Sequence, residues 1–326
     1  MVLSNTKQPY LPEVAAALAQ APDVAVWETD EDIRQSRTAT AALFEADRDA
    51  ILSSPDFHVE EKLVPGPLGD IAISIISPKI RGTKGLRPGI FHIHGGAMVV
   101  GDRFLGVKLL SRFITELDAV IVTVEYRLAP EHKGMALVED CFAALKWFGD
   151  HLEEFEVNPR WLLVAGASAG GGLAAGTVLL ARDRNGPELC GQMLLCPMLD
   201  DRNETVSIAQ YDRERGTYCG AQNKIAWRCV LGDQVGKECV SMYTAPARAV
   251  DLSGLPPAYV DVGGAEPFRD EAIAYALKLS QYGVVTDFYL WGGGNHGFER
   301  IAPEASTSKS SAQVRANWLH NLFSKQ

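Results

Sequence analysis

The sequence predicts an α/β protein with a mostly parallel central sheet and helices on both faces. Three observations lead to this prediction. Short apolar runs typical of buried strands alternate with longer amphipathic stretches typical of helices. A Pro-Gly-Pro turn at residues 65–67 separates the first two strand candidates, as in a hairpin. Strand–helix units then follow one another, and such units place parallel strands under crossover helices.

Residues up to about 55 form amphipathic helical stretches, with a plausible helix start at Leu11-Pro12-Glu13. The predicted strands are 58–64, 70–77, 89–93, 118–126, 161–165, 190–196, 258–262 and 285–290. The predicted helices among them are 105–117, 135–151, 169–180, 271–281 and 308–323. The alternation fails between about 200 and 246, so we divide the chain into a helical segment, 1–55, and a main domain, 56–326, with an insertion at 200–246.

Composition limits the possible partners. The 326 residues carry a formal net charge of −10, which argues against binding to nucleic acid or to an anionic membrane. No stretch reaches the 18 apolar residues of a membrane span, and no signal peptide is evident at the start. The six cysteines form no CxxC pair, and we expect reduced, mostly buried thiols. We therefore expect a cytoplasmic monomer or homodimer that needs no metal or organic cofactor.

The stretch Gly166-Ala167-Ser168-Ala169-Gly170 lies between a predicted strand and a predicted helix. A serine in such a sharp turn has a strained backbone, and the residues two before and two after it approach too closely for side chains. Glycine at 166 and 170 meets this requirement, and the turn exposes the Ser168 hydroxyl. The helix start supplies free N–H groups where an oxyanion would form. A glycine-rich turn that only packs is the alternative.

A second glycine-containing loop, His94-Gly95-Gly96-Ala97, follows the third predicted strand. Its small residues would let backbone N–H groups turn toward a bound oxygen, as an oxyanion hole requires. His92 and His94 could instead be metal ligands, because alternate residues of a strand face the same way. The further clustered ligands of a zinc hydrolase are missing, so we interpret His94 as a structural hydrogen-bonding residue.

The third motif supplies a base and the fourth an acid. His296 stands among glycines in a loop directly after the last strand, where it could reach across the sheet edge. The order nucleophile, acid, base then favours a catalytic histidine. Of the carboxylates near 261–271, Asp261 lies inside a strand, and N-capping would explain Asp270 and Glu271. Glu266 lies in the loop just past the strand, and we predict that it orients His296.

The combination of motifs resembles the hormone-sensitive-lipase-like esterases of the α/β-hydrolase fold. It rests on five segments in family order: FHIHGGAMVVG, VTVEYRLAPEH, GASAGGGLA, EPFRDE and NHGF. The resemblance implies the nucleophile Ser168, the base His296 and an acid at 266. It also implies oxyanion donors from the backbone of Gly95, Gly96 and Ala169, and a cap made by the N-terminal helices and the 200–246 insertion. The motif around Tyr126–Glu131 is then a structural, ion-paired turn below the site.

Three positions depart from the family pattern. The acid is Glu266 where aspartate is more usual, Ala97 replaces a third glycine, and Lys133-Gly134-Met135 replaces an apolar-proline run. None of these changes removes a catalytic group. The expected activity is serine-dependent hydrolysis of a small-molecule ester with a short-to-medium acyl chain, through an acyl-enzyme. The alternatives are a related acyl hydrolase or acyltransferase for amides, formamides or lactones, and a non-catalytic small-molecule receptor. The presence of His296 argues against a receptor.

Overall fold

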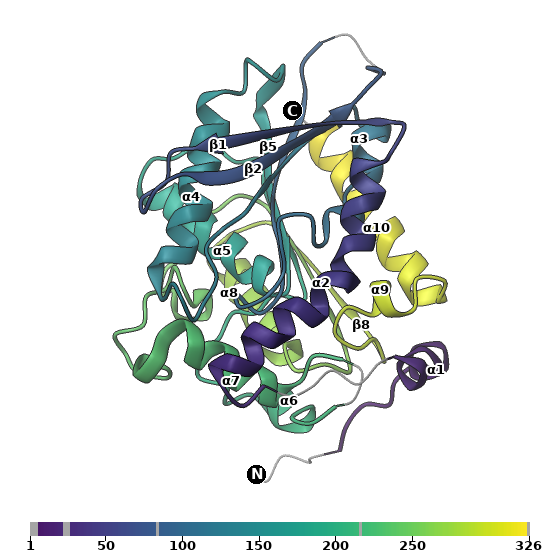
Figure 1. Ribbon diagram of the computed structural model, residues 1–326, viewed down its shortest axis with the longest axis vertical. Coiled ribbons are helices and arrows are strands. Elements are labelled where there is room, and N and C mark those ends of the chain that lie inside the picture. Colours follow the sequence, from purple (N-terminus) through teal and green to yellow (C-terminus); the bar gives the residue numbers. More distant parts are fainter. Residues whose placement is uncertain (1–5, 22–26, 83–84, 215–216, 325–326) are drawn as a thin grey trace.

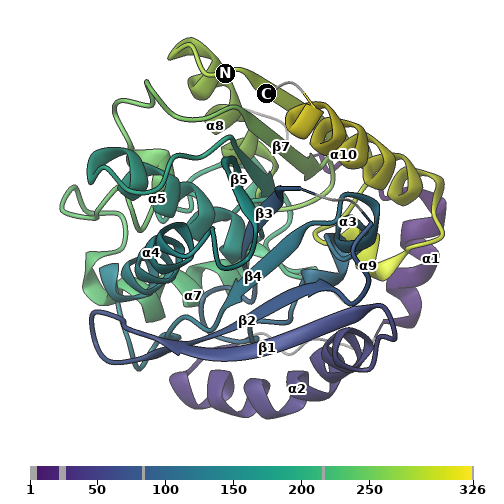
Figure 2. The same ribbon diagram turned by 90° about the horizontal axis from the view of Figure 1, so that it is seen from above.

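The computed structural model describes residues 6–21, 27–82, 85–214 and 217–324. Eight strands form one sheet in the order β1-β2-β4-β3-β5-β6-β7-β8 (Figures 1 and 2). Their bounds are β1 Phe57–Val64, β2 Ile71–Pro78, β3 Arg87–Ile93, β4 Val120–Val124, β5 Val157–Ala167, β6 Gly191–Leu195, β7 Ala258–Gly263 and β8 Thr286–Trp291. The predicted α/β class is confirmed, and each predicted strand is present within a few residues.

The first two strands form the predicted hairpin. β1 pairs antiparallel with β2, and β2 pairs antiparallel with β4. All remaining pairs are parallel, from β4–β3 through β7–β8. The carboxyl ends of the parallel strands therefore meet at one edge of the sheet, which is where ligands bind in such folds.

Helices cover both faces of the sheet (Figure 2). The helices of the main domain are α3 Arg112–Glu116, α4 Met135–Asp150, α5 Ala169–Asp183, α8 Arg269–Gln281, α9 Phe298–Ile301 and α10 Ser306–Ser324. α4, α5 and α8 contribute to a large apolar core on one face, while α3 and α10 contribute to a second core on the other. β5 serves both cores, because Leu162 and Val164 face one and Leu163 and Ala165 the other.

Two local expectations differ from the structure. The helix predicted over 105–117 is interrupted: a 3-10 turn at Val107–Leu109 precedes the short α3. Gly106 precedes this turn with φ of +90°, a backbone conformation that does not belong to a continuous helix. α9 has four residues and was not predicted, since one helical turn is too short to show a periodic pattern.

The two segments outside the alternation are helical. The first contains α1 Pro12–Gln20 and α2 Asp30–Leu52, and the second contains α6 Val206–Gln210 and α7 Gly220–Leu231. The parts of these segments at 1–5, 22–26 and 215–216 lie outside the described residues. α6 and α7 lie at one end of the molecule, and α2 runs from beside α7 toward the opposite end (Figure 1). Thr29 caps α2 by accepting the Asp32 N–H, and the Asp32 carboxylate accepts the Thr29 N–H in return.

Candidate active site

The turn between β5 and α5 has the strained geometry that its sequence predicts. Ser168 has φ of +59° and ψ of −124°, which few residues with a side chain adopt. A Cβ on Gly166 would lie 2.2 Å from the carbonyl oxygen of Gly170, and one on Gly170 would lie 2.1 Å from the Ile93 oxygen. The strain persists because the neighbouring strand fixes the turn: the Ser168 N–H donates to Leu195 O at 2.8 Å.

The structure brings Ser168, His296 and Glu266 together from the ends of three strands. His296 Nε2 lies 2.9 Å from Ser168 Oγ, and His296 Nδ1 lies 2.5 Å from Glu266 Oε2. The other carboxylate oxygen of Glu266 accepts the Gly263 N–H at 3.2 Å, which fixes the carboxylate at the end of β7. The Glu266 side chain is fully buried. This is the hydrogen-bond order of a nucleophile, a base and an orienting acid.

The other carboxylates of this region have different partners. Asp270 accepts the Ser207 N–H at 2.8 Å, and Glu271 accepts the Leu199 N–H at 2.7 Å. Both residues therefore bind neighbouring segments, rather than capping α8 as the sequence suggested. Burial raises the pKa of Glu271 well above its ordinary value.

Asp261 belongs to a separate buried network behind the histidine loop. Its carboxylate accepts hydrogen bonds from Tyr259 at 3.0 Å and from Arg315 of α10 at 3.3 Å. The same guanidinium binds Glu299 of α9 at 2.9 Å. Burial raises the pKa of Asp261 to about 6, although Arg315 opposes the shift. The network ties α9 and α10 to β7, and it anchors the chain that follows His296.

The loop after β3 presents its backbone to Ser168. A Cβ on Gly95 would lie 3.5 Å from the Cβ of Ser168, so the two segments are in contact. Gly96 has φ of +101°, and a Cβ there would lie 1.9 Å from Val100 O, a distance that admits only glycine. Among the described contacts, the N–H groups of Gly95, Gly96 and Ala169 donate no loop or turn hydrogen bond. As the first residue of α5, Ala169 also has no partner within the helix.

Buried side chains hold this loop from below. The imidazole of His94 stacks on Tyr126 with ring centroids 4.1 Å apart, and the Tyr126 hydroxyl donates to His94 O at 2.9 Å. Burial lowers the pKa of His94 to about 4, so it is neutral near pH 7. His92 Nδ1 is paired with Thr123 Oγ1 at 2.9 Å. His92 and His94 belong to no cluster of three potential metal ligands in the described part of the chain, which disfavours the metal alternative.

Two influences act against each other on His296. Burial lowers its pKa, but neighbouring Cys196 and Glu266 more than offset this and raise it well above the ordinary value. Burial also raises the pKa of the Cys196 thiol, so that group is uncharged near pH 7. The negative charge that favours a protonated His296 therefore comes from Glu266.

Three residues near His296, and Trp27 beyond them, are not among the site residues predicted from the sequence. The Tyr218 and Phe268 rings lie 5.4 and 5.1 Å from the imidazole, centroid to centroid. Trp27, just before α2, lies 6.5 Å from Tyr218. Cys196 follows β6 directly, and its position at a strand's carboxyl end was the one available signal. Of the other aromatic residues of the insertion, Tyr211 and Trp227 are buried core, and Tyr243 is partly buried.

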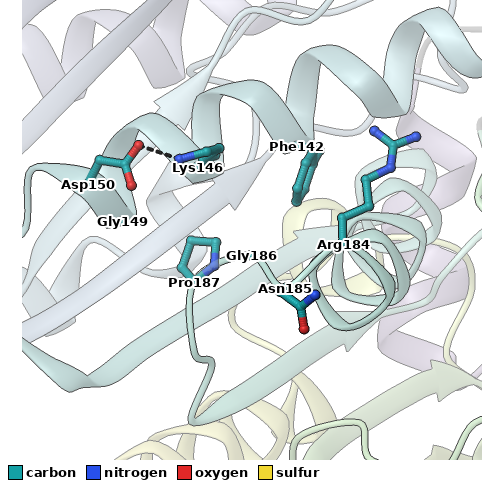
Figure 3. A pocket seen from close by; sticks show the side chains of 8 residues that line it. All are labelled: Phe142, Lys146, Gly149, Asp150, Arg184, Asn185, Gly186 and Pro187. Atoms are coloured by element: carbon teal, nitrogen blue, oxygen red, sulfur yellow. Dashed lines mark hydrogen bonds and ion pairs between the residues drawn. The ribbon is translucent and has the colours of Figure 1, made fainter.

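A pocket of about 290 Å³ lies elsewhere, between α4 and the loop after α5 (Figure 3). α5 begins at the elbow and has 15 residues, so its far end lies about 22 Å from Ser168. The pocket is lined by Phe142, Lys146, Gly149, Asp150, Arg184, Asn185, Gly186 and Pro187. None of the five motifs contributes to it. The pocket is therefore separate from the candidate active site.

Residues 90–300 match the sequence profile of a family with the α/β-hydrolase fold. The chain belongs to that family. The resemblance to its hormone-sensitive-lipase-like branch is confirmed. None of the described helices has the length and apolar character needed to cross a bilayer.

Relatives and solved structures agree with this assignment. The chain is 33% identical to the carboxylic ester hydrolase LipN of Mycobacterium tuberculosis over 302 residues, covering 88% of this chain and 77% of the relative. It is 32% identical to an arylesterase of Saccharolobus solfataricus over 230 residues, or 70% and 73% of the two chains. A bacterial heroin esterase structure superposes with a TM-score of 0.89 and 35% identity, over 96% of this chain and 98% of the other.

Proposed function

We propose that this chain is a carboxylesterase that hydrolyses small-molecule esters through a covalent acyl-Ser168 intermediate. The carboxylesterase class is supported by the family and by relatives named as ester hydrolases. The observation that carries the mechanism is the hydrogen-bonded chain from Ser168 Oγ through His296 to Glu266. Each of its three members comes from a different loop at the same edge of the sheet, so its formation needs the whole fold.

Acylation begins when neutral His296 accepts the Ser168 proton on Nε2 while Oγ attacks the ester carbonyl carbon. The carbonyl oxygen becomes an oxyanion, which the N–H groups of Gly95, Gly96 and Ala169 bind. These donors are in place before the reaction, so binding the oxyanion requires little reorganisation. The protonated histidine then donates its proton to the departing alcohol. In the second half of the reaction, His296 activates water, which releases the acid from Ser168.

Glu266 keeps the Nδ1 proton of His296 in place, and this leaves the Nε2 lone pair directed at Ser168. It also stabilises the imidazolium that forms during both halves of the reaction. Its position is supported from two sides, by the Gly263 N–H and by the imidazole itself. Glutamate has one methylene more than aspartate. The longer Glu266 side chain is buried just past the end of β7, and its carboxylate still reaches His296 Nδ1.

The N-terminal segment and the insertion form the cap in this proposal. α2 reaches the oxyanion loop through Arg37, whose guanidinium donates to Val99 O and to Ala129 O, both at 2.6 Å. The insertion reaches the histidine loop through Thr217, which accepts from Asn295 at 2.9 Å. Tyr218 of the insertion then lies beside His296. These contacts support walls that exclude water from Ser168, where hydrogen bonds to an oxyanion gain most strength.

The aromatic side chains of this cap favour an apolar acyl or alcohol group. Trp27, Tyr218 and Phe268 form a row that ends at His296. We propose short-to-medium acyl chains, because a row of rings that ends beside His296 would leave little room for a long chain at the neighbouring Ser168.

The experiment is hydrolysis of p-nitrophenyl esters of increasing acyl length by wild-type protein, with matched anilide and lactone panels. The proposal predicts the highest kcat/KM for esters of short or medium chain length. Higher kcat/KM for anilides or lactones would assign the same serine chemistry to another substrate class. Activity that survives in Ser168→Ala would contradict the serine mechanism.

A further inference from the structure

The catalytic mechanism gives no task to the thiol that lies beside it. Cys196 Sγ, one imidazole nitrogen of His296 and one carboxylate oxygen of Glu266 lie within 4.8 Å of one another. The backbone that carries the thiol is fixed, because the Cys196 N–H donates to Asp261 O at 2.7 Å and the preceding Leu195 O accepts from Ser168 N. Cys196 thus lies between the loops that carry the nucleophile and the acid.

These three donors are the types that zinc prefers. Zn²⁺ binds thiolate sulfur at about 2.3 Å, imidazole nitrogen at about 2.0 Å and carboxylate oxygen at about 2.0–2.2 Å, usually in tetrahedral geometry. Tetrahedral bonds of those lengths place the donor atoms about 3.3–3.6 Å apart. The ligand atoms lie within 4.8 Å, and Nδ1 and Oε2 are 2.5 Å apart. A small outward movement of the carboxylate would therefore admit the ion.

We propose that Cys196, His296 and Glu266 form a binding site for Zn²⁺ that reversibly inhibits the enzyme. The inhibitory part of this inference rests on the proposed esterase function, whereas the binding part does not. On binding, the thiol releases its proton to water and sulfur forms a bond to the metal. The imidazole nitrogen and the carboxylate oxygen each donate a lone pair, and water leaves the zinc ion in exchange.

Inhibition follows whichever ring nitrogen of His296 binds zinc. If Nδ1 binds, its proton moves to Nε2, which can then no longer accept the Ser168 proton. If Nε2 binds, its lone pair is used by the metal and is lost to catalysis. In both cases Glu266 also ceases to orient the imidazole. Zinc therefore inactivates the base itself. A higher ester concentration restores activity only if the bound ester and the zinc ion cannot occupy the site together.

The preference among ions distinguishes this site from a general effect of divalent cations. Mg²⁺ and Ca²⁺ are bound by oxygen ligands and coordinate thiolate poorly. This site offers one oxygen, one nitrogen and one sulfur. We therefore expect Zn²⁺ and Cd²⁺ to inhibit, and Mg²⁺ at the same free concentration to have no effect.

The first test titrates buffered free Zn²⁺ against hydrolysis of a p-nitrophenyl ester, with each protein normalised to its own metal-free rate. Wild type is compared with Cys196→Ser, Cys196→Ala and the matched control Cys239→Ser, whose cysteine is exposed and belongs to none of the five motifs. Loss of even an outer partner of a metal ligand weakens binding about 10–100-fold. We expect at least that increase in the inhibitory zinc concentration for both Cys196 variants, none for Cys239→Ser, and recovery of the wild type with a chelator.

The second test measures zinc directly, by equilibrium dialysis of Ser168→Ala and of Ser168→Ala/Cys196→Ala. Because Ser168 is not a ligand, the single variant should bind one zinc ion per chain, and the double variant should bind much more weakly. This result stands even if the chain were no esterase, so the two proposals can fail separately. Equal zinc binding or equal inhibition with and without Cys196 would overturn the site. If a Cys196 variant fails to fold, the wild-type protein is alkylated with and without zinc, and labelling of Cys196 is measured by mass spectrometry. The proposal predicts that zinc slows this labelling, and unchanged labelling would contradict it.

Discussion

The loops at the strand ends and the two helical segments that we propose as their cover are held in different ways. The loops are fixed by backbone hydrogen bonds: Ser168 N–H to Leu195 O, and Cys196 N–H to Asp261 O. The covering segments are attached mainly through side chains. Arg37 donates to Val99 O and Ala129 O, and Asn295 of the histidine loop donates to Thr217 of the insertion. A backbone bond, from the Leu11 N–H to Gly293 O, adds to these contacts.

This difference explains why one region has motifs and the other has none. A backbone that must pass within van der Waals distance of another requires glycine at fixed spacing, as at Gly166 and Gly170. A long side chain such as Arg37 can reach a carbonyl from many positions of a helix. Chemistry is therefore assigned to the loops, and we assign access and selectivity to the covering segments.

The largest effect is expected in the loops. Ser168→Ala removes the nucleophile and should lower kcat by about 10⁶, by analogy with the loss of the nucleophile in another serine hydrolase. Because the substitution keeps the backbone hydrogen bond of residue 168, the midpoint of thermal unfolding should change little. Measured activity above a tenth of wild type would contradict the assignment.

The next effect separates the acid from its neighbours. Glu266→Gln should lower kcat about 10⁴-fold, because the amide no longer holds the correct imidazole tautomer. The matched control is Asp270→Asn, whose carboxylate binds the Ser207 N–H instead. It should mainly lower the unfolding temperature. If Asp270→Asn or Asp261→Asn were the crippling change, the assignment of the acid would be wrong.

Removal of residues 1–50 tests the covering segments. The truncated protein should keep most of the sheet but lose much of its kcat/KM, and its preference for acyl chain length should broaden. Circular dichroism and the p-nitrophenyl ester series measure the two parts. An unchanged kcat/KM with an unchanged chain-length profile would show that the N-terminal helices are no part of the site.

A single contact between the two regions should have a smaller effect. Arg37→Met removes hydrogen bonds to Val99 O, Ala129 O and the Glu131 carboxylate, which it binds at 2.8 Å. Hydrogen bonds from a charged group contribute about 1.5–3 kcal/mol each, so we expect lower stability and roughly tenfold lower kcat/KM as the oxyanion loop loosens. Arg34→Met is the control, since Arg34 lies 3.7 Å from Glu131 and is half-exposed. Equal effects of both variants would remove the special role of Arg37.

The smallest effect concerns pH. Only neutral His296 can accept the serine proton, and its pKa is raised well above the ordinary value, with Glu266 supplying the charge. Activity should therefore rise with pH through a midpoint above about 6.5. In Glu266→Gln this midpoint should move to lower pH, because the charge that favours the imidazolium is gone. The measurement is log kcat/KM against pH for both proteins, and a midpoint that does not move would contradict the coupling.

The difference between backbone-held loops and side-chain-held segments also explains which features could be predicted from the sequence. The strands, the hairpin and the loops of Ser168, Glu266 and His296 follow from local patterns, since spacing alone constrains them. Contacts between distant segments left no such pattern. Nothing in the sequence indicates that Arg37 reaches Val99, or that Asp261 pairs with Arg315 of α10. The position of Cys196 at a strand end was visible, but its approach to His296 depends on three loops at once.

The central claim is that Ser168 forms the covalent intermediate, and one labelling experiment tests it directly. A p-nitrophenyl alkylphosphonate should react with one site per chain, release one nitrophenol and abolish esterase activity. Peptide mass spectrometry should then find the phosphonyl group on Ser168, with no labelling of Ser168→Ala and much slower labelling of His296→Ala. A label on Cys196 or another residue, or a protein that stays active when Ser168 is fully labelled, would contradict the account.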